Sequence, residues 1–301
     1  MNPNSAENSL QKQFLNDFTE KVMWRARSDS QRECCQLRFH PQNYDKPNTD
    51  IAKQIGKQLN GGFATTNMPA TLAAVVEKIK KQFGEEMTAD GVDVGQLQRE
   101  RGWKPKNPEE LYPWQVIYRW LWDVKFPREG WELATRLATC GMEQFQMVDI
   151  GDIGKTRREL DLGEIPNRDE TIVKDKKYAL VVNLDAAGYL LLLNRSSKGN
   201  YFCLSPSQAF QPQGECQPRQ LLYIPDVDGL AKSLKFQDEG EEYFLAILTE
   251  KPLDLSWVRP DGNPRDFKVD ESRFREIFQQ IGRQWNGRVF YKQFKVVESP
   301  G

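Results

Sequence analysis

The sequence predicts an α+β protein of two domains: an N-terminal all-α helical domain followed by a C-terminal antiparallel β-sandwich with one late α-helix. Apolar residues recur at helical spacing through most of residues 1–148, whereas alternating and short apolar runs dominate from residue 178 onward. Residues 149–177 are rich in charge and glycine, which is typical of a linker. We therefore expect a helical domain at 1–148, a linker at 149–177 and a β-sandwich-like domain at 178–301.

Helical spacing is clearest in three N-terminal stretches. Residues 8–27 place an apolar side chain at every fourth position, and Asp50 can cap a second helix that ends at Gly61. Residues 72–83 are apolar at i, i+3, i+4, i+7 and i+11, and this helix is expected to end before Gly84. Residues 28–49 lose the periodicity and are expected to form a loop, or a loop with one short element.

Two prolines organise the end of the helical domain. After a short helix near residues 92–101, Pro113 is expected to begin a longer helix, because proline is favoured in the first helical turn. Pro127 is expected to begin another helix, which ends near Gly141. The domain would then contain five or six helices.

The C-terminal half is predicted to be mostly strands. Residues 189–194 are apolar at both odd and even positions, so this strand should be covered on both faces. The other expected strands are residues 171–173, 178–184, 200–204, 219–224, 242–249 and 288–297, and Asp270 is expected to cap the late helix. Strand number and spacing predict a β-sandwich for this half.

Charge and composition exclude several classes of protein. The 42 lysine and arginine residues balance 43 aspartate and glutamate residues, so we expect no nucleic-acid partner. No apolar run approaches the roughly 18 residues of a membrane span, and residues 1–13 do not resemble a signal peptide. The five cysteines are scattered and are expected to be reduced thiols. We therefore expect a cytoplasmic protein that does not enter a membrane.

Three motifs in the C-terminal half resemble a known family. They are GYLLLLN at 188–194, YFCLSP at 201–206, and Gly240-Glu241-Glu242 leading into YFLAILTEKPLDL. Together they cover about residues 170–255 and resemble a bacterial family named domain of unknown function 4384. The resemblance implies an accessory module of signalling or effector proteins, often behind caspase-like peptidases or protein kinases. No kinase glycine loop, HRD or DFG motif precedes it here.

Tryptophans crowd the end of the helical domain, and four of them fall within 18 residues. One helix face cannot bury so many, so at least one should be exposed, next to Arg119, as in binding hot spots. Trp122 is expected to lie nearest the rim of such a surface, although a tryptophan-rich core would explain the same pattern. The candidate binding residues are Trp114, Arg119, Trp120, Trp122 and Trp131, and Trp103 belongs to the same group.

Catalytic and metal motifs are incomplete. Cys34, Cys35 and His40 are the residue types of a nucleophile pair or a metal site, but their spacing matches no standard zinc pattern. Two core thiols and a surface imidazole explain them as well. We expect no metal and no cofactor.

Three functions remain open. The first is a non-enzymatic accessory or adaptor protein of a bacterial signalling or effector system that works through a protein partner. The alternatives are an unfamiliar hydrolase or transferase that uses Cys34 or Cys35 with His40, and a small-ligand-binding β-sandwich, which would need an open concave face.

Overall fold

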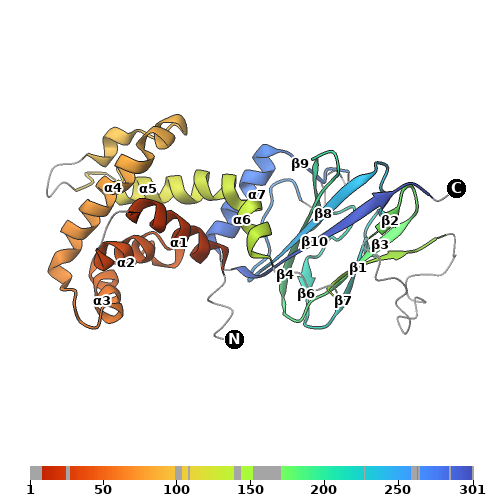
Figure 1. The fold of residues 1–301 in the computed structure, drawn as a ribbon, viewed down its shortest axis with the longest axis horizontal. Helices are drawn as coiled ribbons and strands as arrows, with labels where there is room; N and C mark the ends of the chain where they lie inside the picture. The colour runs from red at the N-terminus through yellow and green to blue at the C-terminus, as the bar shows by residue number, and fades with distance from the viewer. Residues whose placement is uncertain are drawn as a thin grey trace. The chain divides into compact units, whose positions relative to one another are not determined.

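The computed structural model describes residues 9–24, 28–98, 104–107, 109–138, 144–151, 171–226, 228–258, 263, 265–284 and 286–299, with the side chains of 286 and 287 excepted. Contacts divide the chain between Gly130 and Trp131 into a helical unit and a strand unit, and the division falls inside one helix. The architecture is mixed, with helices in the N-terminal part and mostly strands with one late helix in the C-terminal part (Figure 1).

Helices form the N-terminal part of the chain. Phe14 and Phe18 of the first helix, with Ile79 of the fourth, are among its buried core residues, as helical spacing predicts. No described helix is both long and apolar enough to cross a bilayer. The α-helices are α1 (Leu10–Met23), α2 (Asp29–Arg38), α3 (Asn48–Gln58), α4 (Met68–Ala89), α5 (Pro113–Trp120) and α6 (Phe126–Leu137), with 3-10 turns at Pro41–Asn43, Thr65–Asn67 and Val94–Leu97 and a π-helical turn at Leu121–Lys125.

Helix α2, of 10 residues, lies where the sequence predicted a loop or a loop with one short element. Ser28 caps it by accepting a hydrogen bond from the backbone N–H of Gln31. Its buried residues are Cys34, Cys35 and Arg38. Two thiols and the stem of an arginine make an apolar face that a search for aliphatic and aromatic periodicity does not detect.

Helix α4 continues through Gly84 instead of ending before it. Met87, one turn beyond Phe83, is fully buried, so the apolar face extends past the glycine. Packing of this face outweighs the roughly 1 kcal/mol by which a helical glycine is less favourable than alanine. Farther on, the helix predicted near residues 92–101 is a 3-10 turn at Val94–Leu97, and residues 99–101 lie outside the described part.

Pro127 does not begin a new helix, because the helix from Pro113 runs on through it. The backbone N–H of Phe126 donates to Leu121 O, one residue farther back than in an α-helix. A proline inside a helix lacks an N–H and crowds the carbonyl four residues earlier. We attribute the accommodation of Pro127 to the wider π-helical turn that directly precedes it.

The strand unit contains two sheets. The first is β1 (Phe145–Asp149), β3 (Tyr178–Asn183) and β7 (Leu221–Ile224), in the order β1-β3-β7. The second has the order β2-β10-β8-β4-β5-β9, with β6 paired to β4, and is antiparallel except for the β2–β10 pair. Its strands are β2 (Thr171–Val173), β4 (Gly188–Arg195), β5 (Tyr201–Ser205), β6 (Glu215–Cys216), β8 (Gly240–Thr249), β9 (Lys268–Val269) and β10 (Asn286–Val297), and α7 (Glu271–Arg283) is the late helix.

Strand β4 is covered on both faces, as predicted. Leu190 and Leu192 lie in one hydrophobic cluster with residues of the three-stranded sheet, such as Leu180. Leu191 and Leu193, on the other face, are also at most 1% exposed. On that second face Tyr201 contacts Phe274 of α7, with ring centroids 5.1 Å apart. The sheets therefore share one core, and helix α7 lies on the far side of the larger sheet.

The structure moves the predicted domain boundary from residue 148 to Gly130. Strand β1 lies at the predicted end of the helical domain but pairs antiparallel with β3, and it buries Phe145 and Met147 in the strand core. The end of α6, from Trp131, also belongs to the strand unit. Within the predicted linker, residues 171–173 form the expected strand, and residues 152–170 lie outside the described part of the chain.

Candidate functional site

The tryptophan-rich stretch divides into core and surface. Trp120 and Trp122 are each 1% exposed, so the expectation that Trp122 lies at a rim is wrong. The Trp122 indole donates to Phe39 O at 2.9 Å, and its ring contacts Phe14 and Phe126. Rotation of 100° per residue does not hold in the π-helical turn, and α1 covers the side that was expected to face solvent. These two tryptophans are structural.

Trp131 belongs to the strand unit and is buried there. Its ring lies 5.0 Å from Tyr201 and 6.2 Å from Phe274, and it is 7% exposed. Trp103 lies outside the described residues. The predicted binding group is therefore not an exposed surface as a whole, because Trp120, Trp122 and Trp131 are buried.

Trp114 and Arg119 remain accessible, and the structure adds Tyr44, whose ring contacts Trp114, and Tyr118, whose ring contacts Tyr44. Trp114 is half-buried, and its ring centroid lies 5.6 Å from that of Tyr44. The ring centroid of Tyr44 also lies 4.5 Å from that of Tyr118, which follows Trp114 by one helical turn. Arg119 is exposed. We call Tyr44, Trp114, Tyr118 and Arg119 the aromatic surface.

A buried arginine fixes this surface in place. Arg38 is 1% exposed, and its guanidinium donates to the carbonyl oxygens of Asn43, Tyr44 and Lys46 at 2.6–2.8 Å. It also stacks on the Trp114 ring at 3.8 Å. Burial lowers the pKa of Arg38 to about 10, partly offset by the neighbouring Cys34. The loop that carries Tyr44 is thus tied to α5 by one side chain.

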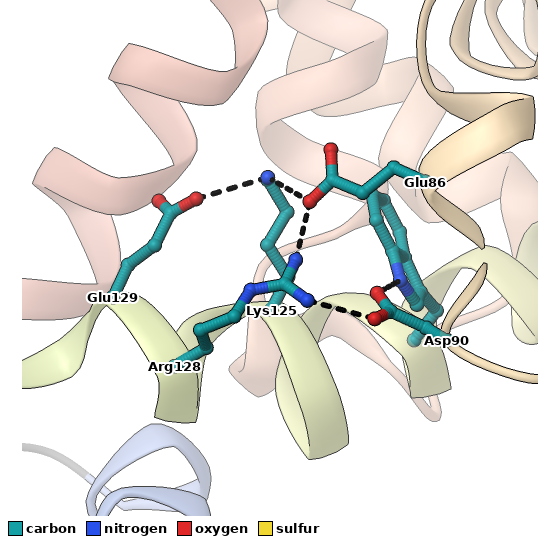
Figure 2. Close-up of polar contacts among 6 residues, drawn as sticks. Glu86, Asp90, Lys125, Arg128 and Glu129 are labelled. Carbon is teal, nitrogen blue, oxygen red and sulfur yellow. Dashed lines mark hydrogen bonds and ion pairs between the residues drawn. The ribbon is translucent and has the colours of Figure 1, made fainter.

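A second buried cation, Lys125, lies in the π-helical turn. Its ammonium lies between Glu86, at 2.7 Å, and Glu129, at 2.9 Å (Figure 2). Arg128 also pairs with Glu86 and bonds Asp90 at 2.7 Å. The Lys125 side chain is only 5% exposed, so paired carboxylates compensate the loss of its hydration.

Asp90 ends this charge network. Burial alone would raise its pKa, but hydrogen bonds from the Trp120 indole and Arg128, with the charges of Arg128 and Lys125, lower it. Every charge of the network thus has an opposite charge within it. We interpret the network as structural.

Cys34, Cys35 and His40 do not form a nucleophile site. Burial raises the pKa of both thiols to about 12, so neither is a thiolate at neutral pH. His40 is half-buried, which lowers the pKa of its imidazole, and its Nδ1 accepts from the backbone N–H of Gln42. Among the described residues no group of three or more His, Cys, Asp or Glu side chains could hold a metal ion.

The strand unit has an open cleft of about 740 Å³ that sequence reasoning did not locate. Its floor includes Phe202 and Phe244, which lie on the face of the larger sheet that the three-stranded sheet also covers. Leu230, which is 62% exposed, also lines it, in a loop before β8. The smaller sheet covers part of this face, and the cleft lies over a part that it leaves uncovered.

Glu242 of β8 is the one charged side chain in this cleft that is buried, at 4% exposed. One carboxylate oxygen accepts from the Asn194 amide at 2.9 Å and the other from the backbone N–H of Ser197 at 3.1 Å. Burial raises the pKa of Glu242 in spite of these two bonds. A buried carboxylate of raised pKa in an apolar cleft is a candidate binding or catalytic group.

Comparison with known proteins adds little. No family model and no curated protein matches the chain. One solved structure is similar in part: Pseudomonas fluorescens alkylpurine DNA glycosylase AlkC bound to DNA containing an abasic site analog, at 12% identity and a TM-score of 0.16. The match covers 66% of this chain and 49% of that one, so the chain spans about half the length of the glycosylase.

Proposed function

We propose that this protein is a non-enzymatic accessory or adaptor protein of a bacterial signalling or effector system that acts through protein–protein contacts. The observation that supports the proposal is the aromatic surface of the helical unit. Aromatic and arginine side chains dominate binding hot spots, and rings that are already fixed lose little freedom on binding. Buried Arg38 holds Tyr44 and Trp114 in this way.

The proposed contact residues differ from the group that the sequence predicted. Trp120, Trp122 and Trp131 are excluded because they are buried. The proposed contact residues are Trp114 and Arg119 from the predicted group, together with Tyr44 and Tyr118. Arg119 has no ion pair to a described residue, so its charge is available to an acidic group of a partner.

For the strand unit we propose a β-sandwich that serves as the accessory module. The hydrophobic cluster shared by the two sheets supports this interpretation, and so does the resemblance of residues 170–255 to the bacterial domain family. The described cysteines are all free and buried, which is consistent with a reducing compartment, and we propose the cytoplasm. The high pKa of the Cys34 and Cys35 thiols argues against the hydrolase alternative.

The test is capture of partner proteins by the full chain from a bacterial extract, with identification by mass spectrometry and a Kd for each purified candidate. We expect Trp114→Ala to weaken the Kd roughly thirtyfold, which corresponds to about 2 kcal/mol for a hot-spot residue. The matched control is Trp24→Ala, because Trp24 is 81% exposed in the same unit. A Kd that Trp114→Ala leaves unchanged would refute the aromatic surface, and a loss with Trp24→Ala would move the contact to the end of α1.

A further inference from the structure

Glu242 is a buried carboxylate whose described partners are all neutral. Its two oxygens accept from Asn194 and from the Ser197 N–H, and the charged group that affects it is Asp238, which has the same sign. Asp238 is itself paired with Lys198 at 2.8 Å. No described cation forms an ion pair with Glu242, and none lowers its pKa.

Such an arrangement is unfavourable unless a further group completes it. Removing a carboxylate from water costs several kcal/mol, which two hydrogen bonds from neutral donors offset only in part. Each carboxylate oxygen can accept two hydrogen bonds. Among the described residues, one oxygen accepts from the Asn194 amide and the other from the Ser197 N–H. Glu242 thus has acceptor capacity and charge left over for a donor that enters the cleft.

The hydrogen bonds alone do not account for a carboxylate at this position. A glutamine oxygen could accept from the Ser197 N–H and hold the turn between β4 and β5 without the desolvation of a charge. The matched interior charge of the helical unit, Lys125, has two carboxylates within 2.9 Å. The negative charge of Glu242 is what remains to be explained.

The rest of the cleft suits the stem of a basic side chain. Phe202, Phe210 and Phe267 line it, with the Phe267 ring 6.0 Å from Phe202 and 4.9 Å from Phe210. Apolar surface accommodates the methylene stem of lysine or arginine, and aromatic faces attract the cation. Lys235 and Arg265 also line the cleft, but they are exposed, so water and salt screen their charges.

We propose that this cleft binds a lysine or arginine side chain of a partner polypeptide, with the cation against Glu242 and the stem along Phe202, Phe210 and Phe267. The volume of about 740 Å³ is in the range of clefts that enclose a ligand of drug size, and so fits a basic residue with its neighbours better than a single amine. The site lies in the strand unit, and its occupancy does not depend on the aromatic surface of the helical unit.

The test uses blocked tripeptides and isothermal titration calorimetry with the full chain. One pair is leucyl-lysyl-leucine and leucyl-norleucyl-leucine, and the other replaces these central residues with arginine and citrulline. Each pair differs in the cation, while stem and backbone stay nearly the same. We expect the cationic peptide of at least one pair to bind ten times or more tightly than its neutral analogue. Equal binding within both pairs, or no heat from any peptide at millimolar concentration, overturns the proposal.

Two variants of strand β8 test whether the cation binds at Glu242. Glu242→Gln should remove the preference for the cationic peptide, whereas Glu241→Gln, on the same strand but with its side chain toward the other face, should preserve it. A preference that persists in Glu242→Gln refutes the role of Glu242. If Glu242→Gln fails to fold, the comparison of peptides on the unaltered protein still decides the proposal, with Phe210→Leu as the variant that should weaken binding. Hexylamine that binds as tightly as the lysine peptide would refute a polypeptide as the occupant.

Discussion

The helical unit and the strand unit differ in how they treat a buried charge and the aromatic rings near it. Lys125 has two carboxylates within 2.9 Å, and the rings of Phe83 and Trp120 beside it are buried. Glu242 has neutral donors only, and Phe202 and Phe210 in its cleft are half-buried. The charge of Lys125 is balanced by carboxylates of the fold, whereas Glu242 has no ion-pair partner among the described residues and lies beside an open cleft, which is the basis of the proposed basic ligand.

The largest expected effect tests whether the aromatic rings of the helical unit are core. Trp122→Ala should destabilise the helical unit by about 3–5 kcal/mol, because it empties a buried site and leaves Phe39 O without its donor. The measurement is native-state hydrogen exchange, which reports the opening free energy of each unit separately. Trp24→Ala is the control and should change little. An unchanged exchange pattern in Trp122→Ala would mean that the Trp122 side chain is not part of the core.

A large loss of stability in Trp122→Ala is the opposite of what helical geometry predicted, because ideal helical rotation placed Trp122 at an exposed rim. The apolar repeats of α4 and β4 are local and were detected in the sequence, although α4 runs past Gly84, where it was expected to end. The burial of Trp122 depends on a π-helical turn and on Phe14, more than 100 residues earlier in the chain. Neither leaves a mark in the spacing of nearby residues.

The cleft escaped prediction for a related reason. Glu242 reads in the sequence as a polar residue at the start of a strand, a common and uninformative position. Its burial is set by Asn194 and Ser197, which come from another strand and its turn. The wall containing Leu230 comes from a loop with no periodicity. Arg38 was likewise missed, since a lone arginine gives no signal that it is buried.

A smaller effect is expected from breaking the paired charge. Lys125→Met keeps the apolar stem but removes the cation shared by Glu86 and Glu129. Breaking a fully buried pair costs about 3–5 kcal/mol, but these carboxylates are 33% and 39% exposed, so we expect roughly 1–2 kcal/mol in the helical unit.

The control for this variant is Lys53→Met, which removes the exposed pair to Asp50 and should cost no more than about 0.5 kcal/mol. Urea denaturation or hydrogen exchange measures both variants. Equal effects of the two substitutions would mean that Lys125 is not a buried, paired charge, and the contrast with Glu242 would fail.

The smallest expected effect is a difference in pH dependence between the two units. The pKa of Glu242 is raised by burial, so the folded state binds its proton more tightly than the unfolded state does. The charged form therefore lowers stability above the raised pKa, and this penalty disappears as pH falls toward the ordinary glutamate pKa of about 4.3. The pKa of Asp90 is lowered, so its contribution is fully present above the ordinary aspartate pKa of about 3.9 and is lost only below it.

Two variants separate the contributions of Glu242 and Asp90 to the pH dependence of stability, measured from neutral pH to about pH 4.5. The stability difference between wild type and Glu242→Gln should change over this range, in the sense that wild type gains relative to the variant as pH falls. The difference for Asp90→Asn should stay constant, because Asp90 remains ionised throughout. Hydrogen exchange in the strand unit and in the helical unit, respectively, gives the two differences. A constant difference for Glu242→Gln would mean that the carboxylate titrates as if it were in water, and the cleft would then hold no buried charge for a cation to complete.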